Sequence, residues 1–252
     1  MFYDTVRSGT CGKGDGKVAK PPEKSGRSEV DAFLAKVAAA PARQPSGNRG
    51  RLIFAMDATM SRQPAWDNAC QIQGEMFHET AQLGGLDVQL VYYRGFGECR
   101  ASKWVSDPKA LLRLMTSVTC RAGHTQIERV LSHAIRETAK RKVDALVFVG
   151  DALEENIDDL GQRAGELGIL GVPVFVFHEG GDPAVRRAFE EVARLSGGAY
   201  CPFDMGSAAQ LRELLRAVAV YAAGGRKALL EFGERSGSSG VRLLAHQMRG
   251  AG

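Results

Sequence analysis

The sequence has no closely spaced cysteines. The five cysteines among 252 residues are widely scattered and form no Cys-x-x-Cys pair. This spacing argues against a zinc knuckle, because such a site takes its ligands from closely spaced pairs. It also argues against a disulfide framework of the kind that stabilises small secreted domains. We therefore expect reduced thiols and a cytoplasmic location. The cysteines are Cys11, Cys70, Cys99, Cys120 and Cys201.

Long hydrophobic runs and a strong charge of one sign are also missing. No segment approaches the ~18 apolar residues that a membrane-spanning helix needs, and residues 1–20 contain no apolar stretch suited to a signal peptide. The net charge of +4 is slight for this length, and no basic patch is interleaved with aromatic residues. We expect neither a membrane nor a nucleic acid as a partner.

Large apolar residues are scarce at both ends of the chain. We expect residues 1–50 to be a disordered basic tail, with a short helix over 28–40 that ends at Pro41. Residues 225–252 are rich in Gly and Ser and carry two small apolar groups, which could form short docking helices. Between them, residues 51–224 have ordinary globular composition, and the whole chain is 44% hydrophobic and 25% charged. One organised domain with two tails is expected.

Within this domain, apolar strand patterns alternate with helical periodicity. Residues 99–105 are expected to run back as an antiparallel edge strand, and Pro108 opens a short helix. Strands are expected at 52–56, 88–93, 143–149, 172–177 and 199–202, and longer helices at 64–83, 125–142, 156–167, 183–195 and 207–221. This order predicts an α/β fold, a doubly wound and mostly parallel sheet with one antiparallel edge strand and helices on both faces.

Polar side chains follow directly behind the first predicted strand. Asp57, Thr59 and Ser61 are alternate residues, so on an extended stretch they turn toward one point. A carboxylate and two hydroxyls are hard oxygen ligands, which suit Mg²⁺, Ca²⁺ or Mn²⁺ rather than zinc. Asp, Ser and Thr after a strand are also ordinary turn and cap residues, so this pattern alone leaves both interpretations open.

Two further oxygen ligands lie in the context that such a site requires. Thr125 precedes a predicted helix, and Asp151 ends the apolar strand at 143–149. In an open parallel sheet, ligands bind at the carboxyl ends of the strands where the winding reverses. The five residues Asp57, Thr59, Ser61, Thr125 and Asp151 are therefore predicted to form a metal site.

Three segments together resemble the metal-ion-dependent adhesion site of the von Willebrand factor A (VWA) family. They are Asp-x-Thr-x-Ser after the first strand, a loop Thr before a middle helix, and an Asp after a later strand. The resemblance covers roughly residues 51–224. It implies a Rossmann-like VWA fold, hydroxyl ligation of Mg²⁺ by Ser61, Thr59 and Thr125, and direct or water-mediated binding by Asp57 and Asp151. The chain departs from the family pattern in having Thr59 in place of the more usual Ser.

The resemblance also implies a function. Family members recognise proteins by letting an acidic side chain of the partner complete the shell of the metal ion. We therefore expect a non-enzymatic interaction module whose partner supplies an Asp or Glu. Related intracellular proteins often work beside ATPases or in the assembly of metal enzymes, so an ATPase or assembly factor is the implied partner.

Local helix capping offers another interpretation of two of these residues. Thr125 with Glu128, and Asp151 with Glu154, each match a capping-box pattern, which would occur without any metal.

His178 and Glu179 are expected to lie in a loop. Replacing Asp57 by Ala is expected to change stability little, since a carboxylate at a strand end is expected on the surface.

A metal-dependent hydrolase on a similar sheet is the alternative function. A haloacid-dehalogenase-like phosphatase also has an Asp after its first strand, but it needs a second carboxylate two residues on, where this chain has Thr59. A receiver domain would want a Lys at the end of the fifth strand, where this chain reads Phe177-His178-Glu179. No nucleotide-binding glycine motif follows a predicted strand.

Overall fold

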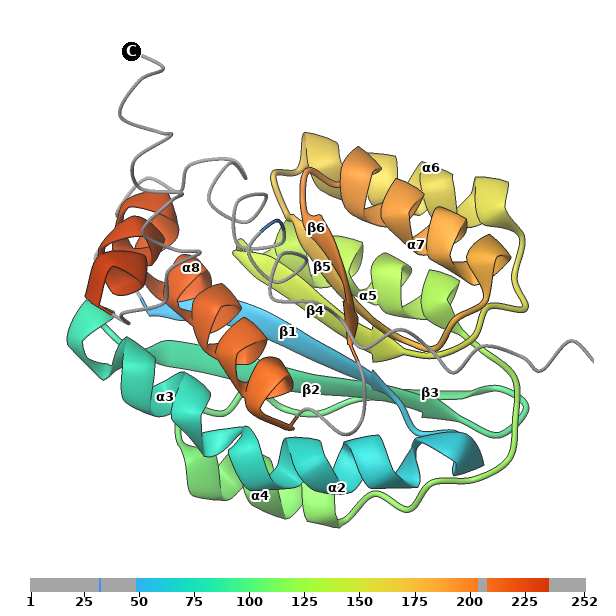
Figure 1. Cartoon of the computed structure of the whole chain (residues 1–252), viewed down its shortest axis with the longest axis horizontal. Coiled ribbons are helices and arrows are strands. Elements are labelled where there is room, and N and C mark those ends of the chain that lie inside the picture. Colours follow the sequence, from blue (N-terminus) through green and yellow to red (C-terminus); the bar gives the residue numbers. More distant parts are fainter. Residues whose placement is uncertain (1–31, 33–48, 204–207, 236–252) are drawn as a thin grey trace, which may run out of the picture.

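Six strands form a single sheet in the computed structural model, which describes residue 32 and residues 49–203 and 208–235. The strand order is β3-β2-β1-β4-β5-β6 (Figure 1). All neighbouring pairs are parallel except β2 with β3, which is antiparallel. The strands are β1 (Gly50–Asp57), β2 (Leu86–Arg94), β3 (Glu98–Ala101), β4 (Ala145–Gly150), β5 (Val174–Glu179) and β6 (Ala199–Phe203).

Helices cover both faces of this sheet (Figure 1). One layer consists of α2 (Gln63–Ile72), α3 (Gly74–Thr80), α4 (Pro108–Thr116) and α8 (Ala208–Arg235). The other consists of α5 (Ile127–Lys140), α6 (Ile157–Ile169) and α7 (Pro183–Leu195). Short 3-10 turns follow β1 and α3, at Met60–Arg62 and Ala81–Leu83. The predicted doubly wound α/β fold with one antiparallel edge strand is confirmed.

Strand β1 lies at the centre because its side chains are apolar on both faces. Leu52 and Phe54 belong to the core beneath the first helix layer, whereas Ile53 and Ala55 belong to the core beneath the second. Such a continuous apolar run suits a parallel strand that is covered on both sides. From β1 the chain continues to β2 on one side and later to β4 on the other, so the winding reverses between β1 and β4. That reversal places the ends of β1 and β4 at the position where ligands bind in such sheets.

Two helices differ from their expected bounds. The helix expected over 64–83 is divided at Gln73, where Gly74, a residue with low helix propensity, begins α3. The last helix continues to Arg235 and bends at Gly225, whose φ of 71° is accessible to glycine without strain. Ala228 and Leu229, which lie in α8 beyond the bend, are buried in the core.

The outer parts of the expected tails lie outside the described residues. The same is true of the apolar group at 241–248 and of the short helix expected over 28–40, of which only residue 32 is described. None of the described helices is both long and apolar enough to cross a membrane. The four cysteines in the described part of the chain, Cys70, Cys99, Cys120 and Cys201, are free thiols.

Candidate metal centre

Asp57 ends β1 and is almost completely buried, with 1% of the residue exposed. Its Oδ1 accepts a hydrogen bond of 2.7 Å from the backbone N–H of Thr59, which holds the chain as it leaves the strand. Its Oδ2 is also buried and has no hydrogen-bond partner among the described residues. Buried carboxylate oxygens are normally paired, so this oxygen is suited to a ligand that the protein alone does not supply.

Burial controls the charge of this carboxyl group. Desolvation raises the pKa of Asp57 to about 6, although the hydrogen bonds from Thr59 act in the opposite direction. The nearby Asp151 adds to the increase, and the Arg62 guanidinium opposes it. The phenol of Tyr93 is buried beside the same group, and burial together with the Asp57 charge raises its pKa well above the ordinary value. A bound cation would favour the ionised form of Asp57.

Two hydroxyls connect the end of β1 to the end of β4. The Thr59 and Ser61 hydroxyl oxygens are 3.4 Å apart, and the Ser61 hydroxyl donates a 3.0 Å hydrogen bond to Oδ2 of Asp151. Thr59 is extended, and Ser61 lies in the 3-10 turn that follows it. The structure therefore brings four of the five predicted ligands, Asp57, Thr59, Ser61 and Asp151, into one hydrogen-bonded series.

Thr125, the fifth predicted ligand, is buried in the loop before α5. Its hydroxyl accepts a 2.9 Å hydrogen bond from the backbone N–H of Glu154, and its own N–H donates to the Glu154 carboxylate at 3.1 Å. These bonds tie the loop before α5 to the loop that follows Asp151. Within the described residues no hydrogen bond joins Thr125 directly to the other four. A second lone pair leaves its hydroxyl able to bind an ion.

The capping-box interpretation of Thr125 and Asp151 is wrong. Helix α5 begins at Ile127, and the N–H of Glu128 donates to the Glu155 carboxylate rather than to Thr125. Helix α6 is capped by Asn156, whose side chain accepts from the N–H of Asp158 at 2.8 Å. One residue, Gln126, separates Thr125 from α5, and five residues separate Asp151 from α6. Neither Thr125 nor Asp151 is therefore occupied by helix capping.

Arg62 is a component of the site that sequence reasoning missed. Its side chain is 2% exposed, and its guanidinium forms an ion pair with Glu179 at the end of β5 and lies 3.8 Å from Oδ2 of Asp151. One terminal nitrogen, Nη2, is buried without a hydrogen-bond partner in the described structure. This fixed positive charge offsets the charges of the surrounding carboxylates. No local pattern around Arg62 indicates its role, because its partners come from strands far along the chain.

His178 and Glu179 do not form the loop that was expected, since both belong to β5. The His178 ring is buried, and its Nδ1 is 2.8 Å from the Tyr200 hydroxyl. Burial lowers the pKa of His178 below the ordinary histidine value. Its Nε2 is buried and unpartnered within the described part of the chain. Glu179 binds Arg62 instead of pairing with His178 in a metal site.

The donor set fits a hard divalent ion. It consists of two carboxylates and three hydroxyls. Elsewhere among the described residues, no three or more His, Cys, Asp or Glu side chains form a cluster that could hold a metal ion. A hydroxyl-rich set with two carboxylates matches the oxygen ligands that Mg²⁺ and Mn²⁺ prefer. The buried, unpartnered Oδ2 of Asp57 is the observation that supports an ion here.

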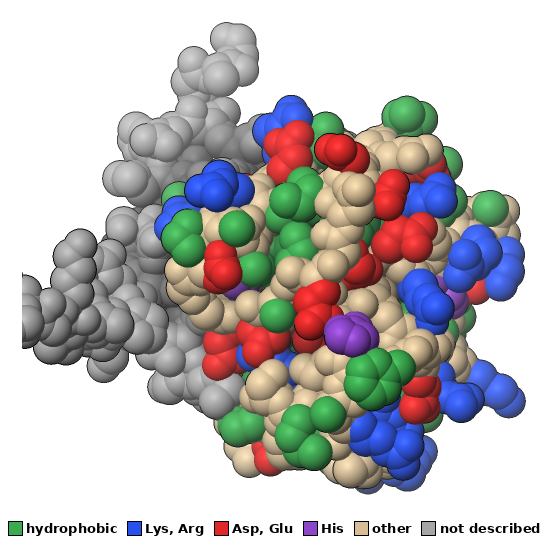
Figure 2. All heavy atoms as spheres, turned by 90° about the vertical axis from the view of Figure 1, so that its right-hand side faces the viewer, with side chains coloured by type: hydrophobic (Ala, Val, Ile, Leu, Met, Phe, Trp, Pro, Cys, Tyr) green, Lys and Arg blue, Asp and Glu red, His purple; other side chains and the backbone are tan. Residues whose placement is uncertain are grey.

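The surface around the site combines acidic groups with an exposed aromatic ring. On the face shown in Figure 2, Asp and Glu side chains gather near the centre beside a histidine and hydrophobic groups. His124 Nδ1 is 2.7 Å from a Glu154 oxygen, and the ring of Phe96, which is 82% exposed, packs edge-on against the His124 ring. A pocket of about 350 Å³ lies beside Thr125 and is lined by Phe96, His124 and Glu155. A partner could reach the site from this side.

Comparisons with known proteins support the fold. No family model matches the sequence, and no curated protein matches it. Among solved structures, the SpRpn10 VWA domain is similar with 12% identity and a TM-score of 0.52, covering 70% of this chain and 97% of that domain. The pilus adhesin SpaC from Lactobacillus rhamnosus GG has 11% identity and a TM-score of 0.55, covering 77% of this chain and 31% of the adhesin.

A third similar structure is proximal thread matrix protein 1 from the mussel byssus, with a zinc-occupied MIDAS motif. It has 15% identity and a TM-score of 0.52, covering 68% of this chain and 46% of the mussel protein. This chain thus spans less than half of the adhesin and of the mussel protein. At such identities the likeness concerns the fold alone, and the chain has a VWA-like α/β fold.

Proposed function

We propose that this chain is a protein-interaction module that binds a partner's carboxylate through a divalent cation. The observation that carries the proposal is the buried Oδ2 of Asp57, which has no partner in the described structure and lies at the strand end where ligands bind in such sheets. The VWA-like fold supports it, since the mussel protein with that fold is described with a zinc-occupied MIDAS motif.

The five oxygen ligands would bind the ion in two ways. Ser61, Thr59 and Thr125 would contribute hydroxyl oxygens, and Asp57 and Asp151 would bind the ion directly or through water. Mg²⁺ takes about six oxygens in octahedral geometry and keeps water where the protein does not reach. We propose Mg²⁺ or Mn²⁺ as the ion because the protein ligands are all oxygens.

An acidic side chain of the partner would complete the shell. Thr59 and Ser61 are neutral, so the negative charge comes from two carboxylates, and the Arg62 guanidinium 3.8 Å from Asp151 offsets part of it. The ion would therefore remain electrophilic on its exposed side. At about 4 Å and an effective dielectric near 20, attraction between two unit charges is on the order of 4 kcal/mol before desolvation is subtracted. An Asp or Glu of the partner would gain from this attraction.

We propose that the module has no catalytic activity of its own. The main alternative, a haloacid-dehalogenase-like phosphatase, needs a second carboxylate two residues after the nucleophile, and this chain has Thr59 there. Thr59 also interacts with Ser61, which joins it to the metal-ligand series rather than to an acid–base pair. A cytoplasmic location, with an ATPase or assembly factor as the partner, remains part of the proposal and agrees with the free thiols in the described part of the chain.

Calorimetric titration of the metal-stripped protein tests the site. We expect Mg²⁺ or Mn²⁺ to bind, and Asp57→Ala or Asp151→Ala to weaken binding by at least about tenfold, because each removes one of the two negative ligands. Asp158→Ala is the matched control, since Asp158 is an exposed carboxylate in the first turn of α6. Equal binding by the wild type and the Asp57/Asp151 double variant would rule out the proposed site.

A further inference from the structure

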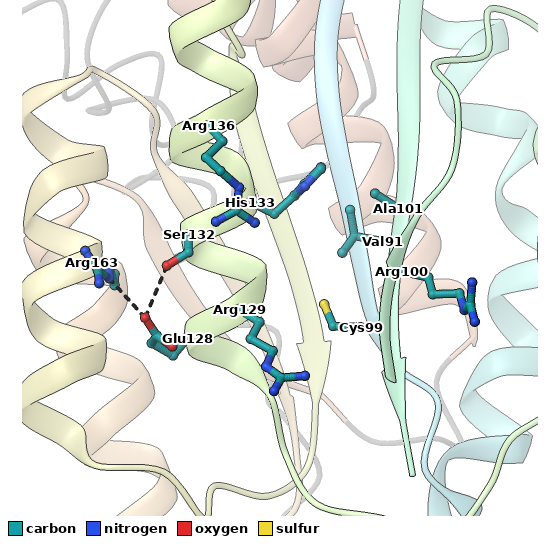
Figure 3. A pocket seen from close by; sticks show the side chains of 10 residues that line it. All are labelled: Val91, Cys99, Arg100, Ala101, Glu128, Arg129, Ser132, His133, Arg136 and Arg163. Atoms are coloured by element: carbon teal, nitrogen blue, oxygen red, sulfur yellow. Dashed lines mark hydrogen bonds and ion pairs between the residues drawn. The ribbon is translucent and has the colours of Figure 1, made fainter. Parts of the chain in front are cut away.

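The helix layer formed by α5, α6 and α7 does not extend over the edge strand β3. Helix α5 packs against α6, and α6 against α7, so α5 is the last helix of this layer on the side of β3. Beside α5 lies a groove of about 500 Å³, whose floor includes Val91 of β2 and Cys99 and Ala101 of β3 (Figure 3). The floor is thus made of small side chains without charge.

Alternation along β3 determines which side chains face this groove. Cys99 and Ala101 are two residues apart and point to the same face of the sheet, whereas Arg100 points to the other. Figure 3 agrees, because Arg100 extends away from α5. The Arg100 guanidinium binds Glu98, the next residue on its own face, at 2.8 Å. Arg100 therefore directs its charge away from the floor.

The wall of the groove comes from one face of α5. Arg129, His133 and Arg136 are spaced by four and three residues, so they share a side of the helix. Figure 3 shows Arg129 and His133 extending from α5 toward the strands, with Arg136 a turn further on. Both arginines act electrostatically on the Cys99 thiol, although burial outweighs them and raises the pKa of Cys99 to about 11. The two charges therefore border the floor.

These two arginines lack the carboxylates that neutralise their neighbours. Arg163, on the other side of α5, is bound to Glu128 and Glu166, and Arg94 is bound to Glu98. Arg129 donates only to neutral oxygens, those of Gly97 and the Gln126 side chain. Arg136 has no hydrogen bond or ion pair with any described residue. Arg129 and Arg136 thus have no carboxylate partner among the described residues, whereas Glu128, which also lines the groove, is paired with Arg163.

His133 adds no third charge at neutral pH. Its Nε2 is 2.8 Å from Oε1 of Gln89, an acceptor that fixes the proton on this nitrogen. Burial lowers the pKa of His133, and the like charges of Arg136 and Lys140 act in the same direction, while Glu137 opposes them. The ring therefore forms a neutral part of the wall.

We propose that this groove binds an acidic, amphipathic segment of another protein, lying beside α5 on the uncovered end of the sheet. Its carboxylates would pair with Arg129 and Arg136, and its apolar side chains would contact the half-buried Cys99 and the exposed Ala101. The two arginines are seven residues apart, about 10 Å along the helix axis, which an elongated segment spans and a single phosphate group does not. Among the described residues, no Phe, Tyr or Trp lines the groove to offer a nucleic acid base a stacking surface.

The ends of this chain are poor candidates for the occupant. Residues 236–252 contain Arg242 and Arg249 and no Asp or Glu, and residues 33–48 contain Lys36 and Arg43 and no Asp or Glu. Residues 1–31 carry a near balance of both charges. We therefore assign the acidic segment to another protein. The groove uses none of the five proposed metal ligands, and it adjoins the pocket beside Thr125 at Arg129, which lines both.

Fluorescence anisotropy with a labelled peptide tests this inference on the full chain. The probe is an acidic peptide of about fifteen residues with Glu and Leu at helical spacing, and the same peptide with Lys in place of Glu is the reference. We expect the acidic probe to bind and Arg129→Gln/Arg136→Gln to weaken binding by about tenfold or more. Arg113→Gln/Arg187→Gln, which removes two exposed arginines from other helices, should bind within about twofold of the wild type.

A second variant leaves both arginines in place. Ala101→Glu adds a negative charge to the exposed end of the floor and should abolish binding of the acidic probe without loss of folding. Binding should persist in EDTA and in Asp57→Ala, which separates this surface from the metal site. Equal binding by the two double-arginine variants would overturn the proposal. Binding of inorganic triphosphate without binding of the peptide would also overturn it, in favour of a small anion.

Discussion

Asp57 is both charged and buried, and these two properties conflict in the metal-free protein. The notion that it lies on the surface is wrong, because its side chain is enclosed at the end of β1. A carboxylate in that position loses hydration, which the hydrogen bond from Thr59 and the charge of Arg62 restore only in part. The buried charge of Asp57 therefore destabilises the metal-free folded protein. A bound ion would remove this cost by pairing with the carboxylate, as is common for strained groups at binding sites.

The first residue-scale prediction follows from this conflict. The pKa of Asp57 in the folded protein, about 6, exceeds its ordinary value of 3.8, so the folded state holds its proton more tightly than the unfolded state. Stability should therefore fall as pH rises from about 4 to about 6, by on the order of 2 to 3 kcal/mol from this group. Asp57→Asn should remove that loss and stabilise the metal-free protein at pH 7.

Urea unfolding in EDTA measures this difference. Asp57→Asn should be more stable than the wild type at pH 7, and the difference should disappear only as the pH falls below 3.8, the ordinary pKa of Asp, because Asp57 is then protonated in both states. Asp158→Asn serves as the control, because that carboxylate is exposed in the first turn of α6. If Asp57→Asn proved no more stable at pH 7, burial of the charge would not be the dominant influence on this site.

At the scale of elements, close backbone contacts decide how the helices sit against the sheet. A Cβ added to Gly50 would lie 2.4 Å from the carbonyl oxygen of Ala222, so α8 can approach the start of β1 only because this position is glycine. That contact anchors the helix that closes one face of the core, where Val218 and Ala222 are fully buried. Helix α8 in turn packs against α3 on the same face.

Gly50→Ala is therefore expected to destabilise the fold. The added methyl group would force α8 away from β1, and such overpacking typically costs about 1 to 3 kcal/mol. Gly181→Ala is a suitable control, because no atom lies within 4 Å of the added Cβ and the backbone there is not left-handed. Thermal unfolding compares the two. Equal melting temperatures would show that α8 can move without loss.

At the scale of the whole molecule, the proposed metal site and the groove beside α5 differ in charge. The proposed metal site lies at the carboxyl ends of β1 and β4, whereas the groove lined by Arg129 and Arg136 lies on the face of the sheet beside α5. Figure 2 shows acidic side chains near the centre of one face and Lys and Arg side chains toward one side of it. The two surfaces adjoin at Arg129, which lines both the groove and the pocket beside Thr125.

Capture of a partner by the intact protein should depend on the ion. We expect partner proteins retained from a cytosolic extract in Mg²⁺ to be lost in EDTA and with Thr125→Ala, which removes a proposed hydroxyl ligand. Thr125→Ser should retain capture, because it keeps that hydroxyl and its bond from Glu154. Thr116→Ala is the control, since Thr116 is exposed and its hydroxyl bonds only within α4. Capture that survives EDTA and Thr125→Ala alike would place the interaction on another surface.

The sequence by itself determined the architecture and the order of the elements. The apolar runs of β1 and β4 and the helical periodicity between them are local patterns, and local patterns report which side chains a strand or helix must bury. The break at Gln73 and the continuation of α8 past Gly225 were harder to predict, because a glycine such as Gly74 or Gly225 can end, divide or bend a helix, and its local sequence does not decide which. The candidate ligands were recognisable for the same reason as the strands, since each follows a strand or precedes a helix.

Only the tertiary structure decided how those ligands are connected and what surrounds them. Ser61 meets Asp151 across 90 positions of sequence, and Arg62 meets Glu179 across 117, so no local pattern could reveal either contact. The burial of Asp57 and the tie between Thr125 and Glu154 likewise arise where separate loops pack together. The groove beside α5 depends on which end of the sheet the helices leave uncovered, which is a property of the assembled layers and of no single segment.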